Sequence, residues 1–375
     1  MEFAHVRIDD KPPCGRLAFC LTDDLTGNGL PDVIVGGLGA ERPLSLFGKT
    51  LKLRYLPAIG RVIRRVESNV FWYENPGWVR HDVVTSPDLS VGASLGDITG
   101  NGRNDMVVGQ NLGNELYWFE QPADPTQPWP RYLITDDFHK YHDTQIADID
   151  GDGRPEVVIL SQLSETICYY DIPDDPTRSP WPTSHRHLIA DGVDVEGVEV
   201  VDIDGDGRPE LIAGGNVFFS DQGSWRRETF APGWRWTRVA VGDLNGDGSP
   251  EIALAEGDRP YHDGKLGRLG VFDPVDQDEM VLADDLHNPH TLQLADFTDT
   301  GVPDIFVAEM GLGTNHDPRH LLYRNDGHGD FHPELLSQGI PTHEAKVVDL
   351  NGDGRLDIVG KSYTPTHHVD AWIQQ

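Results

Sequence analysis

Oxygen-bearing side chains recur along the chain at the spacing of a calcium-binding loop. Seven segments begin with Asp, place Asp, Asn or Thr at the third and fifth positions, and carry Asp or Glu at the ninth. They start at Asp24, Asp97, Asp148, Asp202, Asp243, Asp296 and Asp349. Alternate side chains of such a tight loop point at one centre while glycine permits the turn, and hard divalent cations prefer oxygen ligands. The pattern therefore predicts cation-binding loops, with Ca²⁺ as the expected ion.

Four of these loops, the third, fourth, fifth and seventh, have the strongest sets of ligands. The expected ligands are Asp148, Asp150, Asp152, Glu156, Asp202, Asp204, Asp206, Glu210, Asp243, Asn245, Asp247, Glu251, Asp349, Asn351, Asp353 and Asp357. The other three loops rely on Thr and Asn, so we expect them to lack metal or to be held by hydrogen bonds. Ions in such loops offset clustered carboxylates, and we predict a structural role for them.

A second set of residues shares one position of the repeat, six residues before the first Asp of the loop. The third, fourth, sixth and seventh repeats place His142, Glu196, His290 and His343 there. We expect this position to begin the innermost strand and to face the mouth of a central channel. Imidazoles with a carboxylate can bind Zn²⁺ or another divalent cation, or the imidazoles can act as general bases. The alternative is that these histidines only form structural hydrogen bonds at strand ends.

Further candidates lie in connections that should surround the same mouth. Tyr363 and Arg235 join the three histidines as candidate catalytic residues. The candidate substrate-binding residues are Trp234, Trp236, Arg259, His262, His316, Arg319, Lys361 and His367. Aromatic rings beside arginines and carboxylates suit a sugar, because its apolar face stacks while its hydroxyls need donors and acceptors. For any single residue, ordinary polar loop surface is the competing interpretation.

The elements that must position these residues are strands. The loops recur mostly about fifty residues apart. Each follows an apolar stretch and is itself followed by a β-branched run, an aromatic run and a last strand-like run, which makes four strands per repeat. We therefore predict an all-β fold, a seven-bladed β-propeller of four-stranded antiparallel blades in one domain, residues 1–375. The last unit lacks its fourth strand, and Phe3–Asp9 has the matching pattern. The N-terminal strand should close the ring within the last blade.

The first interval between loops is longer because it contains a basic insertion at about residues 41–66. Seven of its residues are Lys or Arg, against the single acid Glu41. It falls between the second and third strands of the first blade, on the face opposite the calcium loops. We interpret it either as a basic lid that attracts an anionic substrate or as an arm that pairs with acids of the protein itself.

Composition limits the partners. The formal net charge of −32 would repel nucleic-acid phosphates and anionic membranes. No apolar run approaches the roughly 18 residues needed to span a bilayer, and the first residues lack a secretory signal, so a cytoplasmic location is the default unless a signal has been removed. The three cysteines, Cys14, Cys20 and Cys168, are expected to be small buried apolar residues.

Three segments together resemble the FG-GAP or VCBS repeat propellers. They are WYENPGWVRHDVV (residues 72–84), HDTQIADIDGDG (142–153) and HEAKVVDLNGDG (343–354). Among such proteins, the segments look like the propeller of aldos-2-ulose dehydratase and related sugar lyases. The resemblance implies a seven-bladed ring, bound divalent cations and, in some members, sugar dehydration or lyase chemistry at the ring mouth.

These observations leave three functional hypotheses. The first is a lyase or dehydratase acting on a sugar or a uronate-containing glycan, or another small anionic substrate, at the channel mouth. The second is a noncatalytic propeller that binds a glycan or a protein. The third is hydrolysis by paired carboxylates such as Glu196 and Glu309, which depends on their separation.

Overall fold

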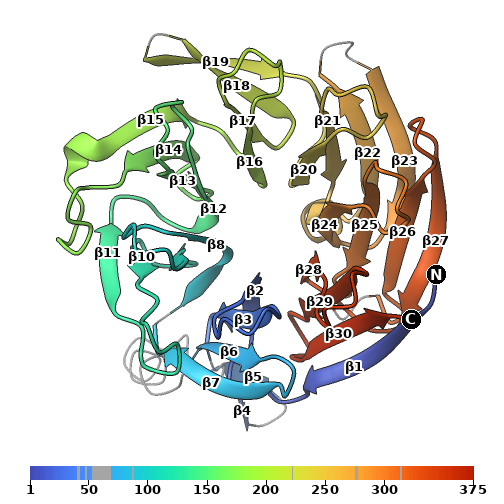
Figure 1. Cartoon of the computed structure of the whole chain (residues 1–375), viewed down its shortest axis with the longest axis horizontal. Coiled ribbons are helices and arrows are strands. Elements are labelled where there is room, and N and C mark those ends of the chain that lie inside the picture. The colour runs from blue at the N-terminus through green and yellow to red at the C-terminus, as the bar shows by residue number, and fades with distance from the viewer. Residues whose placement is uncertain are drawn as a thin grey trace.

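Seven four-stranded antiparallel sheets stand in a ring in the computed structural model of this chain (Figure 1). The structure describes residues 1–39, 43–46, 49–52, 69–86, 88–221, 223–274, 278–312 and 315–375. Blades 1 to 6 run from an inner strand to an outer one in chain order, whereas the outer strand of blade 7 is β1 from the N-terminus. Each loop with the predicted cation-binding pattern, called a cation loop below, joins the first strand of a blade to the second. The predicted all-β, seven-bladed propeller is confirmed.

The strands divide among the blades as follows. Blades 1 and 2 comprise β2 (Leu17–Asp23), β3 (Asp32–Gly37), β6 (Val70–Glu74), β7 (Val79–Val84), β8 (Leu89–Gly96), β9 (Asp105–Gln110), β10 (Leu116–Phe119) and β11 (Arg131–Thr135). Blades 3 and 4 comprise β12 (Tyr141–Ala147), β13 (Glu156–Ser161), β14 (Thr166–Asp171), β15 (Arg186–Asp191), β16 (Val198–Val201), β17 (Glu210–Ala213), β18 (Asn216–Asp221) and β19 (Ser224–Thr229). Blades 5 and 6 comprise β20 (Arg238–Gly242), β21 (Glu251–Ala255), β22 (Gly267–Asp273), β23 (Asp278–Leu286), β24 (Pro289–Ala295), β25 (Asp304–Glu309), β26 (Arg319–Asn325) and β27 (Phe331–Gln338). Blade 7 comprises β28 (Glu344–Val348), β29 (Asp357–Lys361), β30 (Val369–Gln374) and β1 (Phe3–Asp9).

The ring closes through the N-terminal strand. β1 pairs antiparallel with β30, with Phe3 opposite Gln374 and Val6 opposite Ala371. The two ends of the chain consequently lie side by side (Figure 1). This pairing confirms the predicted closure and covers the edge that β30 would otherwise expose.

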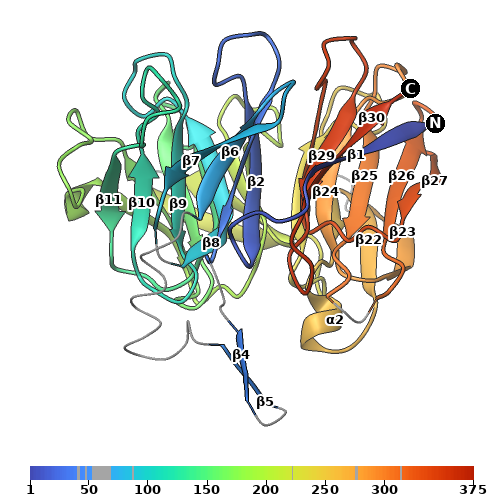
Figure 2. The same ribbon diagram turned by 90° about the horizontal axis from the view of Figure 1, so that it is seen from below.

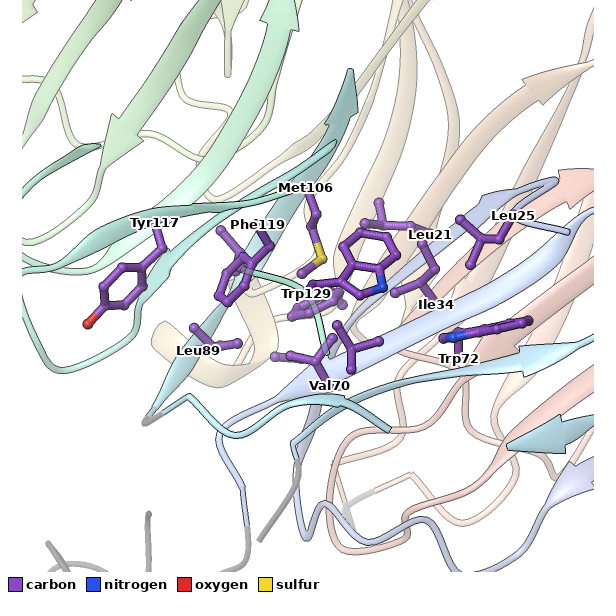
Figure 3. Packing of buried hydrophobic residues seen from close by; sticks show 14 of the residues in the cluster. Leu21, Leu25, Ile34, Val70, Trp72, Leu89, Met106, Tyr117, Phe119 and Trp129 are labelled. Carbon is purple, nitrogen blue, oxygen red and sulfur yellow. The ribbon is translucent and has the colours of Figure 1, made fainter. Parts of the chain in front are cut away.

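Among the described residues, the hydrophobic core consists of seven clusters, one at each interface between consecutive blades. Figure 3 shows the cluster between blades 1 and 2, where Trp72 and Ile34 of blade 1 pack near Met106 and Phe119 of blade 2. Successive side chains of a strand point to opposite faces, so Ile34 enters this cluster while Val33 faces blade 7. The second strands are therefore apolar on both faces, as their β-branched runs predict.

Each cation loop is held by its own carboxylates. The acid at the ninth position accepts the backbone N–H of the second loop residue in all seven blades, for example Leu25 N to Asp32 Oδ2 at 3.0 Å and Ile149 N to Glu156 Oε2 at 3.0 Å. Gly151 and Gly153 have φ of 77° and 90°, a conformation that favours glycine. The loop conformation thus follows directly from the local sequence.

The insertion of blade 1 contains a hairpin, β4 (Pro43–Leu46) paired with β5 (Lys49–Lys52). The remaining residues of the predicted basic segment, 41–66, lie outside the described residues. Figure 2 shows the hairpin on the same side of the ring as the short helix α2 (Arg259–His262). A 3₁₀ turn, η2 (Thr183–His185), precedes β15. Within the described part of the chain, no helix has the length and apolarity to cross a membrane.

Candidate functional site

The three histidines of the shared repeat position line one cavity at the mouth of the ring. His142 and His290 are the second residues of β12 and β24, and His343 immediately precedes β28. All three are buried and border a cavity of about 340 Å³, which Asp258, Arg16 and other residues also line. This end of the inner strands is opposite the end that carries the cation loops.

His142 is held by a buried carboxylate. Its Nδ1 lies 2.8 Å from Asp143 Oδ2, and Asp143 also accepts hydrogen bonds from Gly197 N at 3.0 Å and Arg238 Nη1 at 3.1 Å. Burial lowers the pKa of His142, but the carboxylates of Glu196 and Asp143 outweigh burial, so that its pKa is raised. Burial raises the pKa of Asp143, yet His142 and Arg238 hold it well below its usual range. Because Nδ1 donates to Asp143, Nε2 of the neutral ring carries the lone pair.

Glu196 lies beside His142, with its Oε1 3.7 Å from His142 Nε2. Gln162 Nε2 donates a hydrogen bond to Oε1, whereas Oε2 has no hydrogen-bond partner among the described residues although Glu196 is only 1% exposed. Burial, reinforced by the neighbouring carboxylates of Asp258 and Asp143, raises the pKa of Glu196 to about 7. An unpartnered buried carboxylate oxygen is costly unless a proton, water or cation satisfies it.

His290, His343 and Tyr363 form a stack from blades 6 and 7. The ring centroids of His290 and His343 are 4.0 Å apart, and those of His343 and Tyr363 are 4.4 Å apart. Burial lowers the pKa of His290 to about 3, and burial with the nearby His290 and Lys361 lowers the pKa of His343 well below 6.5. Both imidazoles are therefore neutral at physiological pH.

Lys361 holds this stack in place through its contact with His343. Its ammonium donates to Leu17 O at 3.1 Å, to Ala18 O at 2.7 Å and to His343 Nδ1. The last contact leaves the proton of His343 on Nε2. Lys361 is 1% exposed, and burial lowers its pKa to about 7. Lys361 therefore links blades 7 and 1, which differs from the substrate-binding role expected from the sequence.

The aromatic candidates separate into two environments. Trp236 is half-buried and stacks on His262, with ring centroids 4.2 Å apart, and Arg235 lies over Trp236. Trp234 instead is 6% exposed, belongs to the core between blades 4 and 5, and donates from Nε1 to Glu279 at 3.1 Å. Trp234 borders a separate groove together with Arg235, so neither residue lines the central cavity.

The arginine candidates are engaged in ion pairs that hold loops. Arg259 binds Glu256 at 2.6 Å, and Arg319 binds Glu309 at 2.8 Å. Glu309 is fully buried, and its two oxygens accept hydrogen bonds from His287 N, Asn315 Nδ2, Arg319 N and the Arg319 side chain. Glu309 therefore anchors its loop, and the structure does not favour it as a partner of Glu196 in hydrolysis. His316 and His367 are exposed and do not border the central cavity.

Among the cation loops, the third and fourth bring three acids together. Asp148, Asp150 and Glu156 each offer an oxygen within 4.8 Å of the others, and so do Asp202, Asp204 and Asp206. These sets fit Ca²⁺, which takes several carboxylate oxygens.

In the seventh loop, both oxygens of Asp357 accept backbone N–H groups, from Leu350 at 2.9 Å and Gln374 at 2.8 Å. In the fifth, Asn245 donates to Asp247 and Glu251. The ligand sets predicted there are therefore used partly for hydrogen bonding.

Sequence reasoning missed Asp143 and Arg238, which hold His142. Each directly follows the shared repeat position, and alternation along a strand would place it on the opposite face. In the pairing of β12 with β13, His142 has no partner residue, because the register shifts between Tyr141 and Asp143. Such a bulge changes the direction in which side chains point. The only sequence signal for this orientation is a charged residue next to the shared position.

Two segments of the chain, residues 97–159 and 284–360, match the profile of the FG-GAP-like repeat. The molecule is thus a seven-bladed β-propeller that contains FG-GAP-like repeats. A search of curated proteins found no match. Among solved structures, the Tc holotoxin pore of Photorhabdus luminescens is similar over 91% of this chain and 18% of that chain, with 13% identity and a TM-score of 0.38. The chain therefore spans less than a fifth of that protein, and this likeness carries no functional argument.

Proposed function

We propose that this propeller is a lyase or dehydratase that acts on a sugar or uronate-containing glycan at the cavity formed by His142, His290 and His343. The observation that carries the proposal is the convergence of these imidazoles, from three blades, on one cavity of about 340 Å³. A cavity of this size is within the range of small-molecule sites. Arg16 and Lys140 also line it, and their positive charges suit an anionic substrate in a chain that is otherwise strongly acidic.

The geometry supports an elimination. His142, oriented by Asp143, presents the lone pair of Nε2 as the base that takes a proton from the carbon next to a carbonyl or carboxylate. The electron pair of that C–H bond forms the new C=C bond as the C–O bond on the adjacent carbon breaks. The leaving oxygen takes a proton from an acid, for which the hydroxyl of Tyr363, a residue that lines the same cavity, is the candidate. The products are an unsaturated sugar and water or an alcohol.

A screen of uronate-containing oligosaccharides and reducing sugars for the absorbance of an unsaturated product tests this proposal. We expect turnover that falls at least about 100-fold in His142→Ala and in His343→Ala, because the first change removes the base and the second removes the ring on which the acid Tyr363 stacks. His316→Ala is the matched control, since this exposed histidine lies outside the cavity.

Unchanged turnover in His142→Ala or His343→Ala would remove that residue from the mechanism. Glycan binding without any unsaturated product would instead identify a noncatalytic binding propeller.

A further inference from the structure

Glu196, which the sequence places with the three histidines, converges with Asp258 and His262 beside the central cavity. Asp258 is the N-cap of α2 and His262 is its last residue, four positions later, a spacing that brings two side chains to one side of a helical turn. Glu196 reaches them from the segment before β16 of the neighbouring blade. Each of the three offers one ligand atom, and these atoms lie within 4.8 Å of one another.

The buried carboxylate of this cluster, Glu196, has an incomplete set of hydrogen bonds among the described residues. Glu196 is 1% exposed and its Oε2 has no hydrogen-bond partner among the described residues. The flanking histidines stand too far away for direct hydrogen bonds, with His142 Nε2 3.7 Å from Glu196 Oε1 and His290 Nε2 3.8 Å from Asp258 Oδ1. Two ligands of a tetrahedral ion with bonds of about 2.1 Å lie roughly 3.4 Å apart, and the ligand atoms of Glu196, Asp258 and His262, all within 4.8 Å of one another, are close enough to share one ion.

His262 is also oriented in advance. Its ring stacks on Trp236 with an interplanar angle of 17°, and Asp258 N donates to Trp236 O at 3.4 Å. Trp236 thus holds both ends of the helical turn. A ligand whose rotamer is already restricted loses less entropy when it binds a metal.

We infer that Glu196, Asp258 and His262 bind a divalent transition-metal cation at the interface of blades 4 and 5. The donor set of two carboxylates and one imidazole suits Zn²⁺ or Mn²⁺, whereas Ca²⁺ prefers six to eight oxygens. This set shares Glu196 with the one expected from the sequence and adds Asp258 and His262. His343 fits a metal site poorly, because its Nδ1 accepts from Lys361 and its Nε2 carries the proton. The site stands on its own geometry, independent of the elimination proposed above.

Calorimetric titration of the full chain with ZnCl₂ tests the inference, after chelation and in the presence of saturating Ca²⁺ so that the repeat loops are filled. We expect one high-affinity equivalent of Zn²⁺, weakened at least tenfold in His262→Ala and in Glu196→Gln and unchanged in His316→Ala. Co²⁺ provides a second readout, because imidazole ligation at a tetrahedral site produces visible absorption bands that His262→Ala should abolish.

The inference is overturned if Zn²⁺ fails to bind in saturating Ca²⁺, or if both variants retain wild-type affinity while circular dichroism shows them folded. His262 is exposed, so His262→Ala should fold even if loss of the buried Glu196 perturbs the blade. Because binding is measured without substrate, a failure of the elimination reaction would leave this result unaffected.

Discussion

Charged side chains buried in the channel join different blades of the ring. Asp143 of blade 3 accepts from Arg238 of blade 5 and from Gly197 of blade 4. Gly197 has φ of 78°, and a Cβ there would lie 2.6 Å from Thr237 O, so glycine is required at this approach. Lys361 likewise ties blade 7 to carbonyl groups of blade 1. Each of these single residues positions a histidine of the cavity.

Lys361 should make stability depend on pH. Burial lowers the pKa of Lys361 to about 7 from its usual 10.5, so between these pH values the unfolded chain binds more protons than the folded one. The free energy of unfolding should therefore rise from about pH 7 towards 10.5, by at most about 1.4 kcal/mol per pH unit from this group. Urea denaturation of the wild type and of Lys361→Met at pH 7 to 9.5 measures the difference in slope.

Lys346→Met is the matched control for this titration, because its side chain is 28% exposed in an ion pair with Glu344. Its slope should equal that of the wild type. A Lys361→Met variant that retained the full wild-type slope would show that Lys361 does not titrate in this range.

At the scale of structural elements, the acid at the ninth loop position holds the first hairpin of every blade, and Asp and Glu do so with different hydrogen bonds. Where the ninth loop residue is Asp, its second oxygen accepts an N–H from the end of the third strand, as Asp32 does from Asn75 at 2.8 Å. In the third loop, Glu156 uses only one oxygen for the loop N–H of Ile149. The longer side chain thus leaves an oxygen for a cation.

Ca²⁺ should consequently stabilise the third loop. At a concentration 100 times the dissociation constant, one bound ion raises the free energy of unfolding by about 2.7 kcal/mol. We expect Asp150→Asn to remove most of this increment, because it deletes one charged ligand of the set. Thermal denaturation with Ca²⁺ and with a chelator provides the measurement.

Thr26→Ala, at the equivalent position of the first loop, should leave the Ca²⁺-dependent shift unchanged. If Asp150→Asn and Thr26→Ala respond to Ca²⁺ like the wild type, the third loop does not bind the ion.

The whole ring depends on its closure between β1 and β30. The hydrophobic clusters lie between blades, so the outer edge of blade 7 must be completed for the last interfaces to hold. Asp370, 1% exposed on β30, accepts from His5 at 2.7 Å, from Arg7 and from His368. Its carboxylate therefore attaches the N-terminal strand to the C-terminal one.

Asp370→Ala should loosen this closure. Removing one partner of a buried ion pair costs about 3 kcal/mol, and amide hydrogen exchange should accelerate most in β1. Burial raises the pKa of Asp370, but hydrogen bonds from His368 and His5 and the charges of His368 and Arg7 lower it below 3.8 overall. The stabilisation is thus present above pH 3.8 and is lost as the pH falls through the folded-state value.

Asp82→Ala provides the comparison, since that side chain is 64% exposed and should change stability by less than about 0.5 kcal/mol. Equal hydrogen exchange of β1 in the wild type and in Asp370→Ala would exclude Asp370 as the closing contact.

Much of the fold could be predicted from the sequence because its determinants are local and repeated. Alternating burial makes the second strands apolar on both faces, the Asp and Gly spacing produces each loop, and Phe3–Asp9 has the pattern of the strand that blade 7 lacks. The repeat also carried enough information to place His142, His290 and His343 at one end of the inner strands.

The details of the candidate site depend on contacts between blades, which no local pattern encodes. At the register shift beside His142, Asp143 hydrogen-bonds to the imidazole, and Arg238 of blade 5 donates to Asp143. Packing of blade 4 against blade 5 buries Trp234 in the core and places Glu196 beside Asp258 and His262. Repetition along the chain therefore determined the blades and their order, while side-chain partners across the channel followed only from closing the ring, because closure sets the distances between residues far apart in sequence.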